Sequence, residues 1–133
     1  VYPGGTTDDR ASSGYQFTQN FFSDLGMTTA HSGANNYFAA VLFFLALNGV
    51  GVGLIVYFLS APVLFRTYGP TYILAWLGTI FGVLSGLGYI GVALTPANLY
   101  IDQHILAVYV AFMSLPVAII FYTIAIYLKP GYP

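Results

Sequence analysis

The sequence predicts an all-α membrane protein with three transmembrane helices and an N-terminal arm outside the membrane. Of the 133 residues, 58% are hydrophobic and only 5% are charged, whereas soluble domains carry about 25% charged residues. So few charges cannot cover a water-facing surface, but lipid tails solvate an apolar exterior. The second observation is that three long runs, residues 37–61, 70–94 and 105–128, contain no charged residue.

Residues 1–36 form the predicted arm, which begins with glycine, serine, threonine and aspartate residues typical of turns. Further along, Phe17, Phe21 and Leu25 recur every four residues, and Gly26 follows. This spacing predicts a short interfacial helix near residues 18–25, lying on the membrane surface or against the spans, with Gly26 as its stop signal. The alternative is an ordered loop with its aromatic side chains tucked in.

Residues 37–133 form the predicted transmembrane region. Each uncharged run reaches the roughly 20 residues that an α-helix needs to cross about 30 Å of hydrocarbon. Three crossings put the arm and the connector 95–104 on one side of the membrane, and Arg66 and Lys129 on the other. Because basic residues are enriched in cytoplasmic loops, we expect Arg66 and Lys129 inside and the arm on the extracytoplasmic side.

Glycines within the spans predict close helix packing. The second span carries Gly78, Gly82 and Gly86 at four-residue intervals, and the first carries Gly49 and Gly53. Glycines at this spacing form a groove without side chains, which a neighbouring helix can enter. The neighbour is either a partner subunit or second copy of the chain, or another helix of the same chain.

Asn48 lies near the middle of the first span. An unpaired amide in the hydrocarbon would cost several kcal/mol. We therefore expect Asn48 to face another helix in an interhelical hydrogen bond. The alternative is that it faces a polar pocket on a substrate path.

Candidate chemistry is confined to the arm side, where His31, His104, Asp24 and Asp102 lie. Histidines and carboxylates of this kind can bind Zn²⁺ and activate water. Their spacing contains no H-x-x-x-H or H-E-x-x-H pair, which would place two ligands on one helical face. We expect instead that Asp102 and His104 cap or anchor the third helix, and that Asp24 accepts hydrogen bonds from loop amides. His104 is also a candidate axial ligand for a haem or chlorophyll.

Composition narrows the possible partners and the possible kinds of active site. The net charge is −1 and the chain holds no cysteine. Nucleic acid is therefore not an implied partner, and thiolate metal sites, disulfides and cysteine nucleophiles are excluded. Neither a phosphate-binding loop nor a Gly-x-Ser-x-Gly elbow is present. We predict no catalytic residue and no cofactor, while the 18% of aromatic residues is compatible with bound lipid or pigment.

The arm also resembles a known family. Its Tyr-Pro-Gly-Gly-Thr run at 2–6, its Gly-Tyr pair at 14–15 and its Asn-Phe-Phe-Ser-Asp-Leu-Gly run at 20–26 are similar to the uncharacterised prokaryotic multi-span membrane proteins called domain of unknown function 998. The connector 96–104 begins with proline and ends with the histidine that opens the third span. It resembles the second landmark of that family.

The resemblance implies a location and a set of residues but no known activity. It implies a prokaryotic inner (cytoplasmic) membrane with an extracytoplasmic arm, and it points to Asn20, Ser23, Asp24 and His104 as the positions to examine. Members of that family usually carry one helix before the arm and more helices after the third span, so we expect this sequence to be a truncated or reduced version.

Three functions are compatible with these features. The favoured one is a non-enzymatic accessory or structural subunit that packs through its glycine grooves against a larger membrane complex or a second copy. The second is a small transporter or receptor with a polar mouth around Asp24, Asn48 and His104. The third is a metal-dependent interfacial lipid hydrolase that uses His31, His104, Asp24 and Asp102.

Overall fold

The computed structural model describes residues 1–131 and has the predicted all-helical architecture. In chain order the elements are η1 (Phe22–Gly26), α1 (Tyr37–Ser60), η2 (Ala61–Phe65), α2 (Gly69–Leu94) and α3 (Ile101–Leu128), where η denotes a short 3₁₀ helix. Strands are absent from the described residues, although two isolated β-bridges close turns of the arm.

Three helical segments are long and apolar enough to cross a membrane: Tyr37–Phe65, Gly69–Leu94 and Ile101–Leu128. The shortest α-helix, α1, has 24 residues, or about 36 Å at 1.5 Å per residue, which exceeds the roughly 30 Å of bilayer hydrocarbon. Many large apolar side chains along these helices are exposed, as expected where lipid is the solvent. The chain is therefore an integral membrane protein with three candidate spans.

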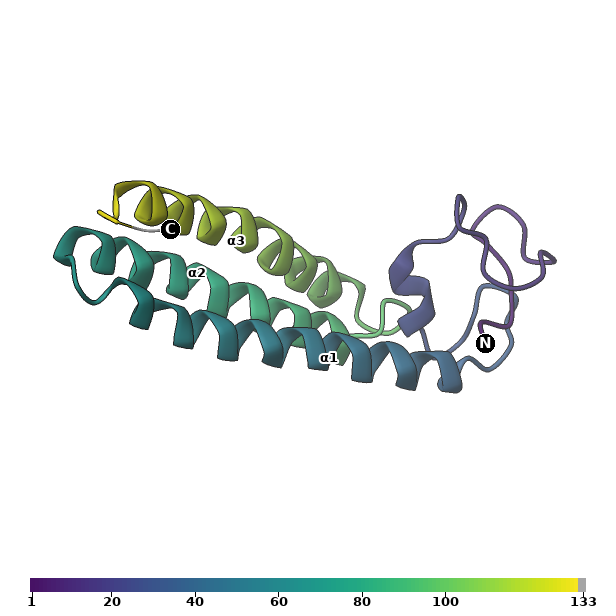
Figure 1. Cartoon of the computed structure of the whole chain (residues 1–133). Helices are drawn as coiled ribbons and strands as arrows, with labels where there is room; N and C mark the ends of the chain where they lie inside the picture. The colour runs from purple at the N-terminus through teal and green to yellow at the C-terminus, as the bar shows by residue number, and fades with distance from the viewer. Residues whose placement is uncertain (132–133) are drawn as a thin grey trace.

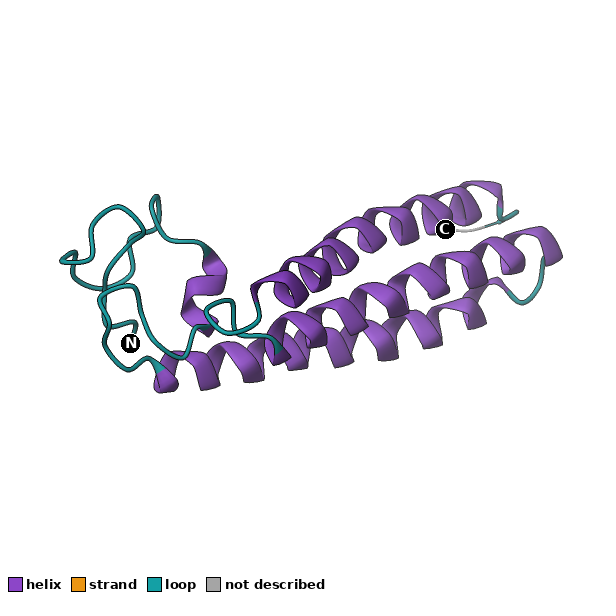
Figure 2. Ribbon diagram, turned by 180° about the vertical axis from the view of Figure 1, so that it is seen from behind, coloured by secondary structure: helices purple, strands orange, loops and turns teal. Residues whose placement is uncertain are grey.

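The helices lie side by side, with α2 between α1 and α3 (Figure 1). The arm and the α2–α3 connector lie at one end of the helices. The turn around η2 and the end of α3 lie at the other. Figure 2, seen from behind, shows the same separation, with the long loops gathered at the arm end. The topology therefore brings the arm and the start of α3 together, although about 70 residues separate them.

The third helix begins earlier than predicted. The sequence pattern indicated a start at residue 105, where the uncharged run begins, but α3 starts at Ile101. Asp102 lies in its first turn, where a carboxylate interacts favourably with the positive end of the helix dipole. The helices α1 and α2 differ from the predicted bounds of the first two spans by only one residue at any end, although η2 extends the first apolar helical segment to Phe65.

Buried polar side chains on α2 connect the three helices. Oγ1 of Thr79 lies 2.9 Å from the Phe58 carbonyl oxygen of α1 and 2.8 Å from the Tyr122 hydroxyl of α3. The Ser85 hydroxyl donates a hydrogen bond of 2.7 Å to the Ala111 carbonyl of α3. Such bonds stabilise helix association in lipid, where water is not available as a competing partner.

The α2 glycines pack within the chain itself. A methyl group added at Gly86 would lie 2.7 Å from the Gly51 carbonyl oxygen of α1, and one added at Gly82 would overlap the Phe58 ring. At Gly78 the added group would lie 2.7 Å from the Tyr122 ring of α3. The α2 groove is therefore filled on one side by α1 and on the other by α3.

The glycines predicted to pack on α1 do not pack within the chain. A methyl group at Gly49 or Gly53 would meet no atom within 4 Å, and it is Gly51 that approaches α2. A four-residue spacing identifies one face of a helix but not the direction in which that face points. Packing of Gly49 and Gly53 against a partner subunit or second copy stays a prediction.

The prediction for Asn48 is corrected by the structure. Its side-chain amide donates a 2.8 Å hydrogen bond to the Phe44 carbonyl of the same helix. This local bond satisfies a donor of the amide without any partner on another helix. Asn48 therefore contributes neither an interhelical hydrogen bond nor, as shown below, a wall of the pocket on the arm side.

The arm contains a helix, but a shorter one than predicted. Only Phe22–Gly26 is helical, and Phe17 and Phe21 are 92% and 72% exposed. The predicted apolar stripe through Phe17, Phe21 and Leu25 therefore does not form. Polar side chains before η1 bind nearby backbone groups and hold that segment in turns. Gly26 ends the helix, as predicted, and a methyl group there would lie 2.5 Å from the Phe43 ring of α1.

Candidate functional site

Asn20 and Asp24 form the centre of the folded arm, and both are buried. The Asn20 amide donates hydrogen bonds to the Gly5 carbonyl at 3.0 Å and to Oδ2 of Asp24 at 2.9 Å. The same Asp24 oxygen accepts the backbone N–H of Phe21 at 3.0 Å, so this carboxylate accepts a bond from a loop amide as predicted. Asn20 and Asp24 therefore hold two segments of the arm together.

His31 connects the second half of the arm to this centre. Its Nε2 lies 3.3 Å from Oδ2 of Asp24, and its backbone N–H donates to the Tyr2 hydroxyl at 3.2 Å. Burial raises the pKa of Tyr2 above its ordinary value. Gly5 has a φ of +86° and lies against the backbone of His31 and Ser32, where a side chain would not fit.

Two sets of hydrogen bonds attach the arm to the helices. Asn36, 2% exposed, precedes α1 and donates to the Met27 carbonyl at 2.7 Å and to that of Leu25 at 3.2 Å. At the α2–α3 connector, the Asn98 amide donates to the Thr28 hydroxyl at 2.9 Å, and its oxygen accepts the Thr28 N–H at 3.0 Å. The arm is thus fixed over the start of α3.

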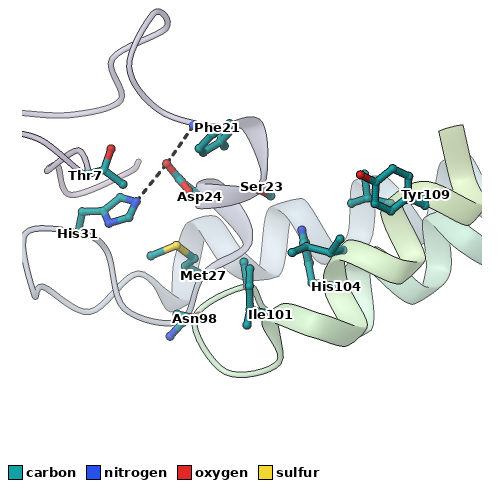
Figure 3. Close-up of a pocket in the computed structure, with 13 residues that line it drawn as sticks. Thr7, Phe21, Ser23, Asp24, Met27, His31, Asn98, Ile101, His104 and Tyr109 are labelled. Atoms are coloured by element: carbon teal, nitrogen blue, oxygen red, sulfur yellow. Dashed lines mark hydrogen bonds and ion pairs between the residues drawn. The ribbon is translucent and has the colours of Figure 1, made fainter.

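A pocket of about 800 Å³ lies between the arm and the start of α3 (Figure 3). Its arm wall includes Ser23, Asp24 and His31, and its α3 wall includes His104 and Tyr109. The volume falls in the range of roughly 300–1,000 Å³ that is usual for small-molecule sites.

The pocket is mainly apolar, and its polar side chains are concentrated toward the arm, where Phe21 and Met27 also line it. Ile101, Ile105, Val108 and Tyr109 form one face of α3, and Tyr109 lies eight residues beyond Ile101, about 12 Å along the helix axis. Ile101, Ile105 and Tyr109 are also exposed, so the pocket opens along the outer face of this helix. Its polar end therefore lies at the level of the arm and its apolar end reaches into the span.

His104 lies at the transition between these two ends and is 4% exposed. Its Nδ1 is 2.6 Å from the Thr95 carbonyl oxygen, which anchors α3 to the connector as predicted. Its Nε2 is buried and has no hydrogen-bond partner among residues 1–131. A buried polar atom without a partner is uncommon in folded proteins. A ligand in the pocket could supply the hydrogen-bond partner that Nε2 of His104 lacks.

The four residues considered as metal ligands, His31, His104, Asp24 and Asp102, do not converge on one point. His31 and Asp24 are 3.3 Å apart, but Asp102 is exposed. Within residues 1–131 no group of three or more histidine, cysteine or acidic side chains is placed to hold a metal ion. The interfacial hydrolase hypothesis stays a prediction, which metal analysis of the purified protein would test.

No protein-family model, curated protein or solved structure matches this chain. Its class follows from the fold and the site: an integral membrane protein with three candidate spans and a pocket where the arm meets the third.

Sequence reasoning identified part of this site. Ser23, Asp24, His31 and His104 were singled out, and all four line the pocket. Asn36 and the Thr28–Asn98 pair were missed, although they position the arm. The available signal was the location of Asn36 and Asn98 beside the ends of the spans, because an amide side chain there can both donate to and accept from neighbouring groups.

Proposed function

We propose that this chain is a membrane-embedded lipid-binding protein of the receptor or carrier type, which takes a single amphiphilic molecule into the pocket between the arm and α3. The observation that carries the proposal is the buried, unpartnered Nε2 of His104 in the wall of a mainly apolar pocket, whose few polar side chains lie on the arm side. An amphiphile has the same division between head group and chain.

The position of the pocket supports this function. His104 lies in the first turns of a candidate span, where the polar interface gives way to hydrocarbon. Because Ile101, Ile105 and Tyr109 are exposed, a lipid can enter from the bilayer without crossing water. The earlier hypothesis of a polar mouth is thereby modified: Asp24 and His104 line the pocket, and Asn48 does not.

The test is photochemical labelling of the purified full chain in detergent micelles. The probes are single-chain lipids with a diazirine in the acyl chain and a glycerol, amine or phosphate head group. We expect at least one probe to label α3 between Ile101 and Tyr109. Ile105→Trp, which fills the pocket, should weaken this labelling about tenfold, equivalent to roughly 1.4 kcal/mol of binding free energy.

Met113→Trp is the matched control, because Met113 is an exposed residue of the same helix outside the pocket. Its labelling should equal that of the parent chain. Labelling spread evenly over all lipid-exposed faces, and unchanged by Ile105→Trp, would show that the probes bind as bulk lipid and not in the pocket.

A second candidate function is the accessory or structural subunit. It is supported by Gly49 and Gly53 of α1, where an added methyl group would meet no atom of residues 1–131 within 4 Å. A helix of a partner subunit or of a second copy can approach closely there. Co-purification with a defined complex after mild detergent extraction tests this function, and recovery solely as an isolated monomer would contradict it.

We also propose that the arm lies on the extracytoplasmic side of a prokaryotic inner membrane. Arg66 directly follows η2 and Lys129 directly follows α3, and these two elements end opposite the arm (Figure 1). This placement agrees with the enrichment of basic residues on the cytoplasmic side. The similarity of the arm to domain of unknown function 998 supports the same orientation. The chain has no cysteine, so Ser12→Cys gives a unique site for a membrane-impermeant maleimide. Labelling in intact cells is expected, and labelling only after lysis would reverse the orientation.

A further inference from the structure

The hydrogen-bonding state of His104 restricts the head group that the pocket can accept. Nδ1 lies 2.6 Å from the Thr95 carbonyl oxygen, and a carbonyl oxygen can only accept a hydrogen bond. Nδ1 must therefore carry the hydrogen. In the neutral ring this leaves a lone pair on Nε2, the atom without a partner. The group that completes this site is thus a hydrogen-bond donor.

The charges around the pocket favour the same class of ligand. Asp24, the acidic residue at the polar end, is buried, and neither lysine nor arginine is among the lining residues. A phosphate or carboxylate head group would find neither lysine nor arginine there, and it would lie near the Asp24 carboxylate, which already contacts His31. Donors, in contrast, find acceptors: the His104 lone pair, the Asp24 carboxylate and the side-chain oxygens of Ser23 and Asn98.

We propose that the pocket selects a single-chain lipid whose head group donates hydrogen bonds, and that Nε2 of His104 accepts one of them. This inference rests on the proposed function. The hydroxyls of a monoacylglycerol and the ammonium of a long-chain amine share the required chemistry. With its head group at His104, the acyl chain lies along Ile105, Val108 and Tyr109, which form the apolar wall of the pocket on α3.

Competition against the photoreactive probe tests the selection. In two pairs of competitors, methyl groups replace the donor hydrogens of the head group: 1-monooleoylglycerol against its dimethyl ether, and oleylamine against oleyltrimethylammonium. We expect the donor-bearing member of at least one pair to compete about tenfold better, the effect of satisfying one buried acceptor. The pair that shows the preference tells a hydroxyl ligand from an ammonium ligand.

His104→Asn separates the role in recognition from the role in folding. The asparagine amide can still donate to the Thr95 carbonyl, as Nδ1 does, but it places no acceptor at the position of Nε2. We expect the preference within the pair to disappear, while the donor-free analogue competes as well as it does for the parent chain. Gln103→Asn, at an exposed neighbouring position, should retain the preference. Hydrogen exchange of the backbone amides of residues 95–105 in the His104→Asn variant verifies that α3 still begins at Ile101.

The outcomes distinguish this inference from the proposed function. If both members of each pair compete equally with the parent chain, or if the preference persists in His104→Asn, the inference is overturned while the pocket remains a lipid site. If no probe labels the pocket, and Ile105→Trp changes nothing, the proposed function and the inference are both overturned.

Discussion

Gly51→Leu is expected to separate α1 from α2 and to lower the free energy of unfolding by about 3 kcal/mol or more, the upper range for overpacking a buried contact. A Cβ atom at Gly51 would lie 2.6 Å from the Gly86 carbonyl oxygen and 2.7 Å from the Ile90 side chain. The carbonyl belongs to a helix backbone and cannot rotate away, so the helices themselves must move apart. Thermal unfolding in detergent, followed by circular dichroism, measures the change.

Gly53→Leu is the matched control, two residues further along the same helix. A Cβ atom there would meet no atom of residues 1–131 within 4 Å. Both variants gain the same helix propensity on replacement of glycine, so this contribution cancels in the comparison. We expect Gly53→Leu to unfold at or above the parent temperature. Equal destabilisation of the two variants would mean that α1 does not present Gly51 to α2.

The same control variant addresses the accessory function. If a partner helix covers Gly49 and Gly53, the double variant Gly49→Leu, Gly53→Leu should keep its fold and lose the co-purifying subunit. Retention of the subunit by this folded variant would place the interface elsewhere on the protein.

Asp24→Ala is expected to open the arm without unfolding the spans. The buried carboxylate accepts hydrogen bonds from the Asn20 amide and the Phe21 N–H, and contacts His31. A hydrogen bond to a charged group contributes about 1.5–3 kcal/mol, so the loss of two bonds amounts to about 3 kcal/mol or more. Hydrogen exchange of the amides in residues 5–36 should accelerate about 100-fold or more, since each 1.4 kcal/mol is a factor of ten.

Asp8→Ala is the control for this experiment, because Asp8 is an exposed residue of the same arm. It removes the same charge from the arm and should leave the exchange rates unchanged. The helical amides of residues 40–60 serve as an internal reference in both variants. Acceleration confined to the residues next to Asp24 would show that the two halves of the arm do not depend on this carboxylate.

The sequence by itself determined the class of the protein and the positions of its helices. The uncharged runs end where charged and turn-forming residues begin, and a helix that fails to span hydrocarbon would leave backbone groups without partners. This constraint acts along the chain alone, so α1 and α2 were predicted almost to the residue. The start of α3 was missed because a charge in the first helical turn is tolerated at the interface, where Asp102 lies.

Only the tertiary structure decided which faces meet and where the site forms. The α1 helix is apolar on all sides, so glycine spacing cannot set its rotation, and the contact between Gly51 and Gly86 does. The pocket likewise requires the arm to fold back over a helix that begins about 70 residues later, through the Thr28–Asn98 hydrogen bonds. Such pairings depend on the shapes of packed surfaces, whereas the span signal depends only on how each residue partitions between water and lipid.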